Sequence, residues 1–243
     1  MIFFLILSEG GLVQSEGISD QENYFTDDFT YFTDDFTPFM ALQKLRSHQP
    51  LKFVEVFPAA KTAKPEKFIF FMSTDGPHGW ASNFHVEKNG YCSNGLQFLT
   101  SEHHLMFLKA EVFKDTKIMA RILEAATPRE AKKLGRQVSP YDENTWSVFR
   151  YRSLYKALEC KFLASPRLAQ LLLKTGDKFL VEAADFDSKF GIGLSEFSCE
   201  IHRGCKIRAT GEFDVEPRNW LGENLLGIAL MELRSNLKRI FAV

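Results

Sequence analysis

Residues 101–113, Ser-Glu-His-His-Leu-Met-Phe-Leu-Lys-Ala-Glu-Val-Phe, decide the fold because they predict one helix with an unusual inner face. Ser101 can cap this helix, since Ser, Thr, Asp and Asn accept hydrogen bonds from the unpaired N–H groups of a first turn. At about 3.6 residues per turn, the large apolar side chains gather on one side, which is expected to pack against the core. They are Leu105, Met106, Val112 and Phe113.

Two charged side chains interrupt the apolar side of this helix. Glu102 and Lys109 fall in the middle of it, two turns apart and nearly aligned, whereas His104 and Glu111 mark the opposite, solvent side. A carboxylate and an ammonium group on a buried face cost free energy unless they are paired or take part in function. We therefore expect Glu102 and Lys109 to face a polar site inside the fold.

Start and stop signals predict four further helices. The clearest start is Thr127-Pro128-Arg129-Glu130, which combines a cap, a proline at the first helical position and a capping-box glutamate. Ser-Pro begins another helix, and glycines are expected to end two of the four. The expected ranges are about 127–135, 145–163, 165–176 and 223–240.

Short apolar runs between turn residues predict a few strands. Phe68–Met72 and Phe179–Ala184 are two of them, and Asn-Gly turns at 89–90 and 94–95 flank a third. The fold class is therefore mainly α with a few short β-strands. We expect one compact domain over residues 67–243.

The first 66 residues differ in kind from the rest of the chain. Tyr-Phe-Thr-Asp-Asp-Phe-Thr occurs twice in succession, at 24–30 and 31–37, and Lys61–Lys67 has the composition of a linker. Alternating acidic and aromatic residues without helical period indicate a disordered arm. The apolar start, Met1–Leu7, is too short for the core of a signal peptide and lacks a preceding basic residue, so a cytoplasmic or nuclear location is expected.

The composition of the chain indicates neither a metal site nor a membrane-binding surface. The 243 residues carry a net charge of −1, which announces neither a nucleic-acid-binding nor a membrane-binding surface. The four cysteines form no recognisable disulfide framework. Cys199, His202 and Cys205 have loop-like metal spacing but lack a partner cluster for a fourth ligand, so no metal and no cofactor are expected.

Other helices repeat the pattern of inward charges. Arg150 and Lys161 project beside Trp146 in the long helix, and Arg234 lies between two leucines in the last one. Each charge alone also fits a structural role, as a snorkelling side chain or a buried ion pair. Five such charges on three helices favour a shared polar cavity.

The chain from Trp80 onward resembles the NADAR family, the YbiA-like domains associated with NAD and ADP-ribose metabolism. The resemblance lies in the order and spacing of short motifs over residues 68–240. They are Ala81–Phe84, Ser101–His103 with Lys109-Ala110, Pro128–Arg136, Trp146, Lys161-Phe162, Leu171–Asp177, Val181–Ala183, Asp187, Gly191–Leu194, Trp220–Gly227 and Leu230–Arg234. Phe190 stands where the family usually has tryptophan, and residues 202–217 form a longer insertion.

The resemblance implies a compact helical fold and N-glycosidase chemistry without a cofactor. Two substrate classes are associated with the family: ADP-ribose on the amino group of guanine, in nucleic acid or nucleotide, and the phosphoribosylamino-pyrimidine intermediates of riboflavin synthesis. Breaking a ribosyl C1–N bond needs a carboxylate near C1 and a proton donor for the leaving amine. Glu102 and Asp187 are the expected carboxylates, and Lys109 the expected donor or, through a Schiff base, the nucleophile.

The remaining motif residues are expected to bind the substrate. Arginines and lysines would hold phosphate oxygens, aromatic rings would face a base, and asparagines would meet ribose hydroxyls. The residues assigned to substrate binding are Ser82, Asn83, Phe84, His103, Trp146, Arg150, Lys161, Glu182, Phe190, Gly191, Gly193, Asn224 and Arg234. A non-catalytic ADP-ribose-binding module is the alternative from another class, and the oligomeric state is not predicted.

Overall fold

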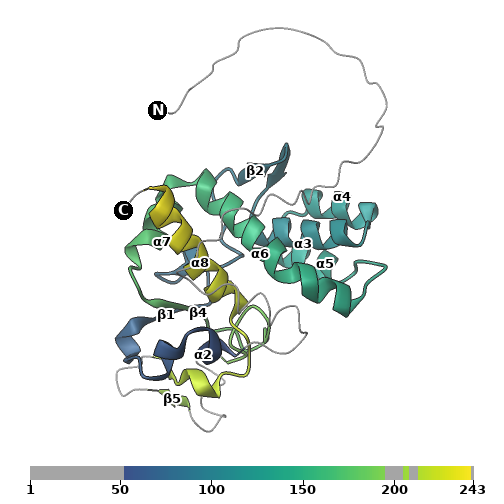
Figure 1. The fold of residues 1–243 in the computed structure, drawn as a ribbon. Coiled ribbons are helices and arrows are strands. Elements are labelled where there is room, and N and C mark those ends of the chain that lie inside the picture. Colours follow the sequence, from purple (N-terminus) through teal and green to yellow (C-terminus); the bar gives the residue numbers. More distant parts are fainter. Residues whose placement is uncertain (1–51, 195–204, 208–212, 242–243) are drawn as a thin grey trace. The chain divides into compact units, whose positions relative to one another are not determined.

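The computed structural model describes residues 52–194, 205–207 and 213–241. Six helices are its main elements of secondary structure, and a one-turn helix α2 (Phe53–Val56) precedes them (Figure 1). They are α3 (Ser101–Val112), α4 (Thr116–Glu124), α5 (Pro128–Gly135), α6 (Glu143–Ala164), α7 (Pro166–Lys174) and α8 (Leu225–Ile240). The expected mainly helical class is confirmed.

The strands are short and form three separate pairs. The parallel pair joins β1 (Phe68–Phe71) to β4 (Phe179–Glu182), with Phe68 opposite Phe179. The antiparallel pairs are β2 (Tyr91–Ser93) with β3 (Leu96–Phe98) and β5 (Cys205–Ile207) with β6 (Phe213–Val215). Asn94 and Gly95 both have positive φ in the turn between β2 and β3, which is the two-residue turn that suits the twist of a hairpin.

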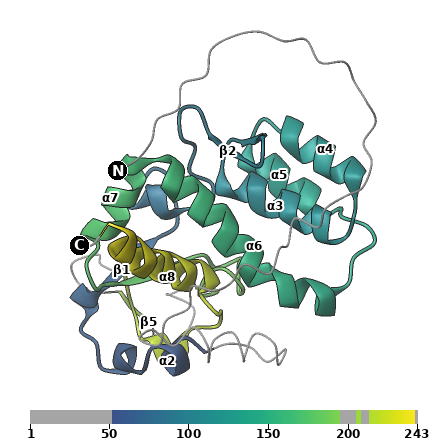
Figure 2. The ribbon, with the colours of Figure 1, turned by 45° about the horizontal axis from the view of Figure 1, so that its top comes forward.

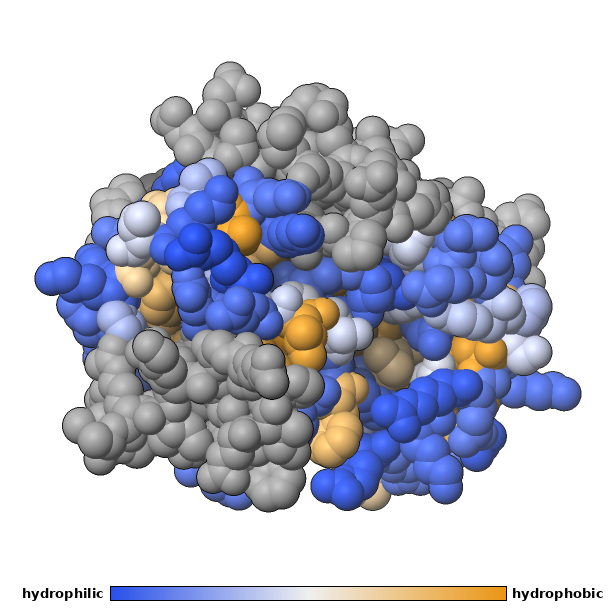
Figure 3. All heavy atoms as spheres, turned by 90° about the horizontal axis from the view of Figure 1, so that it is seen from below, coloured by the Kyte–Doolittle hydropathy of each residue, from blue (hydrophilic) through white to orange (hydrophobic). Residues whose placement is uncertain are grey.

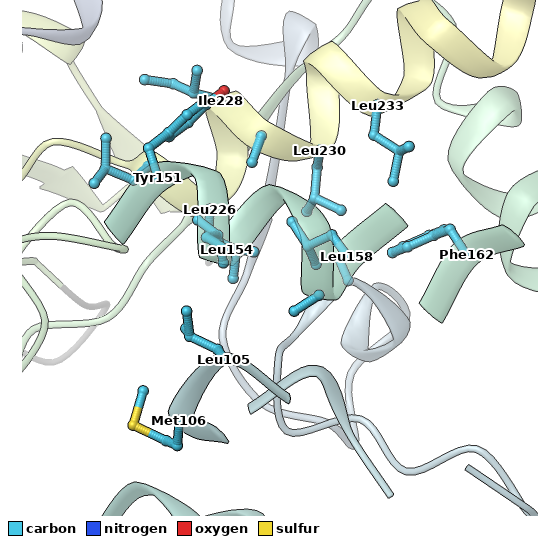
Figure 4. Close-up of a cluster of buried hydrophobic side chains, with 14 of the residues drawn as sticks. Leu105, Met106, Tyr151, Leu154, Leu158, Phe162, Leu226, Ile228, Leu230 and Leu233 are labelled. Carbon is cyan, nitrogen blue, oxygen red and sulfur yellow. The ribbon is translucent and has the colours of Figure 1, made fainter. Parts of the chain in front are cut away.

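The helices fall into two groups that meet at α6. Helices α3, α4 and α5 pack against one another, while α8 packs on β4 and α7; α6 contacts both α3 and α8 (Figures 1 and 2). The core lies between α3, α6 and α8, where Leu105, Leu154 and Leu230 are fully buried (Figure 4). This arrangement places the start of α3, α5 and the end of β4 around one region.

Local signals explain most helix starts. The side chains of Thr127, Asp142 and Ser165 each accept a hydrogen bond from the backbone three residues on. The cap of α3 is Thr100 rather than Ser101, which is the first helical residue. Ser101 Oγ donates to Asn83 Oδ1 at 3.0 Å instead, and this bond ties the start of α3 to the preceding loop.

His104 corrects the expected polarity of α3. The sequence placed it on the solvent side, but it is 3% exposed and its ring stacks on Phe98 with centroids 4.2 Å apart. Burial lowers the pKa of His104 to about 3, so the ring is neutral. The apolar surface that covers it comes from the β2–β3 hairpin, which helix periodicity alone does not reveal.

The boundary of the expected N-terminal arm is also corrected, because Phe53 falls within that arm and yet packs on the domain. Phe53 is 2% exposed, and its ring lies 4.7 Å from that of Trp220 and 5.9 Å from that of Phe179. Residues 53–67 contain three short helical turns, of which the first two bury Phe53, Val54 and Ala60, whereas the expected linker at 61–67 is mostly exposed. The repeated acidic–aromatic segment lies outside the described residues.

On the face seen in Figure 3, hydrophilic residues prevail and hydrophobic ones reach the surface in small groups. In the part of the chain that the structure describes, no helix combines the length and the apolar character needed to cross a membrane.

Candidate active site

Three carboxyl groups and one lysine come together from four parts of the chain. Glu102 stands in the first turn of α3, Glu182 ends β4, Asp187 lies in the following loop, and Lys132 belongs to α5. Each carboxyl group acts electrostatically on the other two or on Lys132, which shows that the four are neighbours. We call these residues the carboxylate cluster.

Backbone contacts fix the members of the carboxylate cluster. The N–H of Glu102 donates to Asn83 O at 3.1 Å, and the N–H of Glu182 donates to Asn224 Oδ1 at 3.0 Å. Asp187 Oδ1 accepts from the N–H groups of the third and second residues after it, at 2.8 and 3.1 Å, and Oδ2 accepts from Lys132 Nζ at 3.3 Å. The Asp187 carboxylate is therefore held in one orientation.

Burial changes the protonation of the two glutamates. It raises the pKa of Glu102 to about 7 and the pKa of Glu182 to about 8, and the charge of Asp187 adds to both effects. Burial opposes the charge of Lys132, but Glu102 and Asp187 outweigh it and raise the pKa of that ammonium group. Near neutral pH the cluster thus holds carboxylic acid, carboxylate and ammonium side by side, which is the equipment of a general acid–base site.

Two oxygens of the carboxylate cluster have no hydrogen-bond partner. Among the described residues, three buried side-chain oxygens lack one, and Glu102 Oε1 and Glu182 Oε2 are two of them. Buried polar atoms are almost always hydrogen-bonded, because an unpaired one costs roughly 1–3 kcal/mol. Two such atoms in one cluster indicate a site shaped for a partner that the protein itself does not supply.

Lys109 lies in a second group of charges, apart from Glu102. Its Nζ donates to Gly135 O at 2.8 Å and sits 4.3 Å from the ring centroid of Tyr141 and 5.9 Å from that of Trp146. The guanidinium carbon of Arg150 also lies 5.9 Å from the ring centroid of Trp146. The expected Glu102–Lys109 pair is therefore corrected: both side chains point inward, but the lysine of the carboxylate cluster is Lys132.

A close approach of two helices makes the Lys109 contact possible. A Cβ atom on Gly135 would lie 2.0 Å from Met106 Sδ, so only glycine lets α5 approach α3 this closely. Burial, followed by the nearby charge of Arg150, lowers the pKa of Lys109. Arg136 acts electrostatically on both Lys109 and Glu102, which makes the second group a neighbour of the carboxylate cluster.

Two basic residues expected to bind phosphate have structural roles instead. Lys161 is 2% exposed, and its Nζ donates to Trp80 O and Ser82 O, both at 2.9 Å. Arg234 Nη1 donates to Thr175 Oγ1 at 2.6 Å and to Lys178 O at 2.9 Å. Both side chains satisfy backbone carbonyls, and neither takes part in the carboxylate cluster.

Three polar residues expected to contact the substrate are likewise occupied. Asn224 is fully buried; besides holding Glu182, its Nδ2 donates to Leu180 O at 2.9 Å. The two ring nitrogens of His103 lie 2.8 Å from Thr100 Oγ1 and 3.1 Å from Ala125 O. Ser82 Oγ accepts from the N–H of Phe84 at 3.2 Å. The polar atoms of these three residues bond within the protein, so they position the backbone around the carboxylate cluster.

The other expected residues stay close to the carboxylate cluster. The Phe84 ring lies 5.7 Å from Lys132 Nζ, and the N–H of Phe190 holds Asp187. A Cβ on Gly191 would meet Glu182 O and Asp187 O at 3.0 Å, and Gly193 has a φ of 68°. Asn83 anchors Glu102, as described above. Six residues of the expected set thus converge: Phe84, Glu102, Glu182, Asp187, Phe190 and Gly191.

Sequence reasoning missed Lys132, Glu143 and Tyr141 as members of the site. Lys132 has the same local context as Lys133, and only the folding of the 182–191 segment onto α5 distinguishes the two. Tyr141 and Glu143 precede or begin α6, where polar residues are ordinary caps. Over the described ranges there is no group of three or more side chains that could hold a metal ion, and residues 199 and 202 lie outside those ranges.

Comparison with known proteins shows similarity along most of the described chain. The model of the NADAR domain matches residues 69–238. N-glycosidase R617 of Acanthamoeba polyphaga mimivirus is 30% identical over 176 residues, which cover 70% of this chain and 95% of that protein. N-glycosidase Npun_R5314 of Nostoc punctiforme is 33% identical over 160 residues, covering 66% and 97%.

A solved structure is similar as well. The NMR structure of the E. coli protein YbiA superposes with a TM-score of 0.55 at 28% identity, covering 75% of this chain and 91% of that one. The family model spans well over half of the chain, and the two relatives named above match over 95% and 97% of their own length. This chain therefore belongs to the NADAR domain family.

Proposed function

We propose that this protein is an N-glycosidase, a hydrolase that breaks the bond between C1 of a ribose and an amino nitrogen. The observation that carries the proposal is the pair of buried, unpartnered carboxyl oxygens of Glu102 and Glu182 beside Asp187 and Lys132. The relatives named N-glycosidases support the same reaction.

The carboxylate cluster contains the groups that this reaction needs. As the C1–N bond breaks, its electron pair goes to nitrogen, and a protonated Glu102 or Glu182 donates a proton to the departing amine. The Asp187 carboxylate stabilises the positive charge that develops on the ribose. Water then adds its oxygen to C1 and returns a proton to the glutamate, so the products are the free ribose hydroxyl and the amine.

Lysine has a supporting role in this scheme. A Schiff base needs a neutral amine, but the carboxylates raise the pKa of Lys132 and keep it protonated. Lys109 has a lowered pKa, yet its Nζ is engaged with Gly135 O and two aromatic rings. We therefore favour direct acid–base hydrolysis over the lysine nucleophile.

The substrate that we propose is ADP-ribosylated guanine, in a nucleotide or a nucleic acid. The family resemblance supports this class, and the cations Lys109 and Arg150 close to the carboxylate cluster suit the phosphates of ADP-ribose. The phosphoribosylamino-pyrimidines of riboflavin synthesis share the ribosylamine bond and form the alternative. A module that only binds ADP-ribose would have no use for two glutamates with raised pKa values.

The test is to incubate the full chain with ADP-ribosylated guanosine and, separately, with a phosphoribosylamino-pyrimidine, and to identify the released base by mass. Release from the first and its loss in Glu102→Gln would support the proposal. Glu111→Gln is the matched control, because Glu111 lies on the same helix outside the carboxylate cluster and should remain active. Release only from the pyrimidine would favour the alternative, and binding of ADP-ribose without release from either substrate would favour the module.

A further inference from the structure

The second group of charges places two positively charged side chains, Lys109 and Arg150, close together. Lys109 and Arg150 share the Trp146 ring, and their mutual repulsion is large enough to affect the ionisation of Lys109. Two cations side by side over aromatic rings are stable only with an anion close by. The reaction proposed above gives Lys109 no part in bond breaking, so this group calls for a separate explanation.

The anion that the protein supplies is Glu143. Its Oε1 accepts from Arg150 Nη2, and its Oε2 accepts from the hydroxyl of Tyr141. The Glu143 side chain is 59% exposed, whereas that of Arg150 is 10% exposed, so the carboxylate covers the outer end of a buried guanidinium. An ion pair with a solvent-exposed carboxylate contributes little stability, so another anion can displace the carboxylate at little cost.

We propose that Lys109 and Arg150 form a subsite for a phosphate group of the substrate, and that Glu143 is an internal counter-ion which the phosphate replaces. The inference rests on the proposed function, since it assigns this group to the same substrate. Arginine binds phosphate oxygens through two parallel N–H···O hydrogen bonds. Lys109 adds a second positive charge, which the single carboxylate of Glu143 does not fully neutralise.

The position of the subsite determines which phosphate it takes. Lys109 Nζ bonds to Gly135 O in α5, and Gly135 lies about one turn after Lys132, which pairs with Asp187 in the carboxylate cluster. The subsite and the carboxylate cluster are therefore adjacent. A ribose with C1 at the carboxylate cluster would direct its 5-phosphate to Lys109 and Arg150, so the subsite selects 5-phosphorylated ribosyl groups over unphosphorylated ones.

The test is calorimetric binding of ribose 5-phosphate and of ribose to the unmodified protein, Glu143→Gln and Glu159→Gln. Glu159 is the matched control, because it lies on the same helix and pairs with Lys156, outside the subsite. We expect Glu143→Gln to bind ribose 5-phosphate about threefold to fivefold more tightly, since an exposed ion pair no longer competes. Glu159→Gln should match the unmodified protein, and ribose should bind weakly to all three.

A second variant keeps the inference testable from the opposite side. Arg150→Lys retains the charge and loses the forked contact, so it should bind ribose 5-phosphate at least tenfold more weakly, and inorganic phosphate should compete in the unmodified protein. Equal affinity for ribose and ribose 5-phosphate, or no gain in Glu143→Gln, would overturn the subsite. Release of base with such a result would leave the N-glycosidase proposal standing, so the two can fail separately.

Discussion

Replacing Glu102 with glutamine should stabilise the protein at alkaline pH while it removes activity. Burial raises the pKa of Glu102 from 4.5 to about 7, which means that the folded state resists ionisation of this group. At 1.36 kcal/mol per pKa unit, the ionised carboxylate costs the folded state about 3 kcal/mol above pH 7. Glutamine has nearly the same shape and never ionises.

The sign of the effect follows from proton linkage. Between pH 4.5 and 7 the folded state binds more protons at Glu102 than the unfolded state, so stability falls as pH rises through this interval and is constant above it. The glutamine amide leaves its own polar atoms without a partner, which offsets about 1 kcal/mol. Glu102→Gln should therefore exceed the unmodified protein by about 2 kcal/mol at pH 8 and be about equal to it at pH 5.

Urea unfolding followed by circular dichroism at pH 5 and pH 8 measures this difference. Glu124→Gln makes the same chemical change at an exposed carboxylate at the end of α4 and should shift stability by less than about 0.5 kcal/mol at both pH values. If Glu102→Gln were equally or less stable at pH 8, the carboxylate would be satisfied in the fold, and the reasoning that assigns it a substrate-directed role would be refuted.

Three further predictions follow from the other buried groups. His104→Phe should flatten the loss of stability between pH 6.5 and 4, because the pKa of His104 is lowered to about 3 and the folded state cannot bind the proton that the unfolded state takes up; acid titration of unfolding checks this, and an unchanged profile would contradict it. Arg234→Ala should lower the free energy of unfolding by about 2 kcal/mol and leave kcat/KM unchanged, because the guanidinium group bonds to Thr175 and Lys178 O and not to substrate. A raised KM in steady-state assays would show that Arg234 binds substrate phosphate. Borohydride added during turnover should trap no covalent lysine adduct detectable by mass, because Lys132 is held protonated; a trapped adduct would establish the Schiff-base route.

Five of the six longer helices could be predicted from sequence because their start and stop signals are local, whereas α4, which Asp115 caps, was not expected. Thr127 caps α5, and Ser165 caps α7, as the residues at those positions predict. The same local information fails for α2, whose buried Phe53 meets rings from Phe179 and Trp220, far along the chain. A short apolar turn of four residues has no periodicity of its own, so its membership of the core depends wholly on those distant partners.

The site could be predicted only in part, for the same reason. Helix periodicity correctly directed Glu102, Lys109 and Lys161 inward. Helix periodicity does not show which atoms each side chain contacts inside the fold, and those contacts determine the role of the side chain. Lys161 donates to two backbone carbonyls, whereas Glu102, near Asp187, keeps one oxygen without a hydrogen-bond partner among the described residues.

The difference between Lys161 and Glu102 gives a physical criterion for sorting buried charges. A structural charge finds its hydrogen bonds within the fold, so its polar atoms have partners whether or not substrate is bound, even where burial shifts its pKa, as it lowers the pKa of Lys161 to about 7. A functional charge remains uncompensated until substrate arrives, and its cost appears as lost stability in the free protein. By this criterion we assign Glu102 and Glu182 to the proposed reaction and Lys161 and Arg234 to the structure, although all four lie on inward faces of helices or strands.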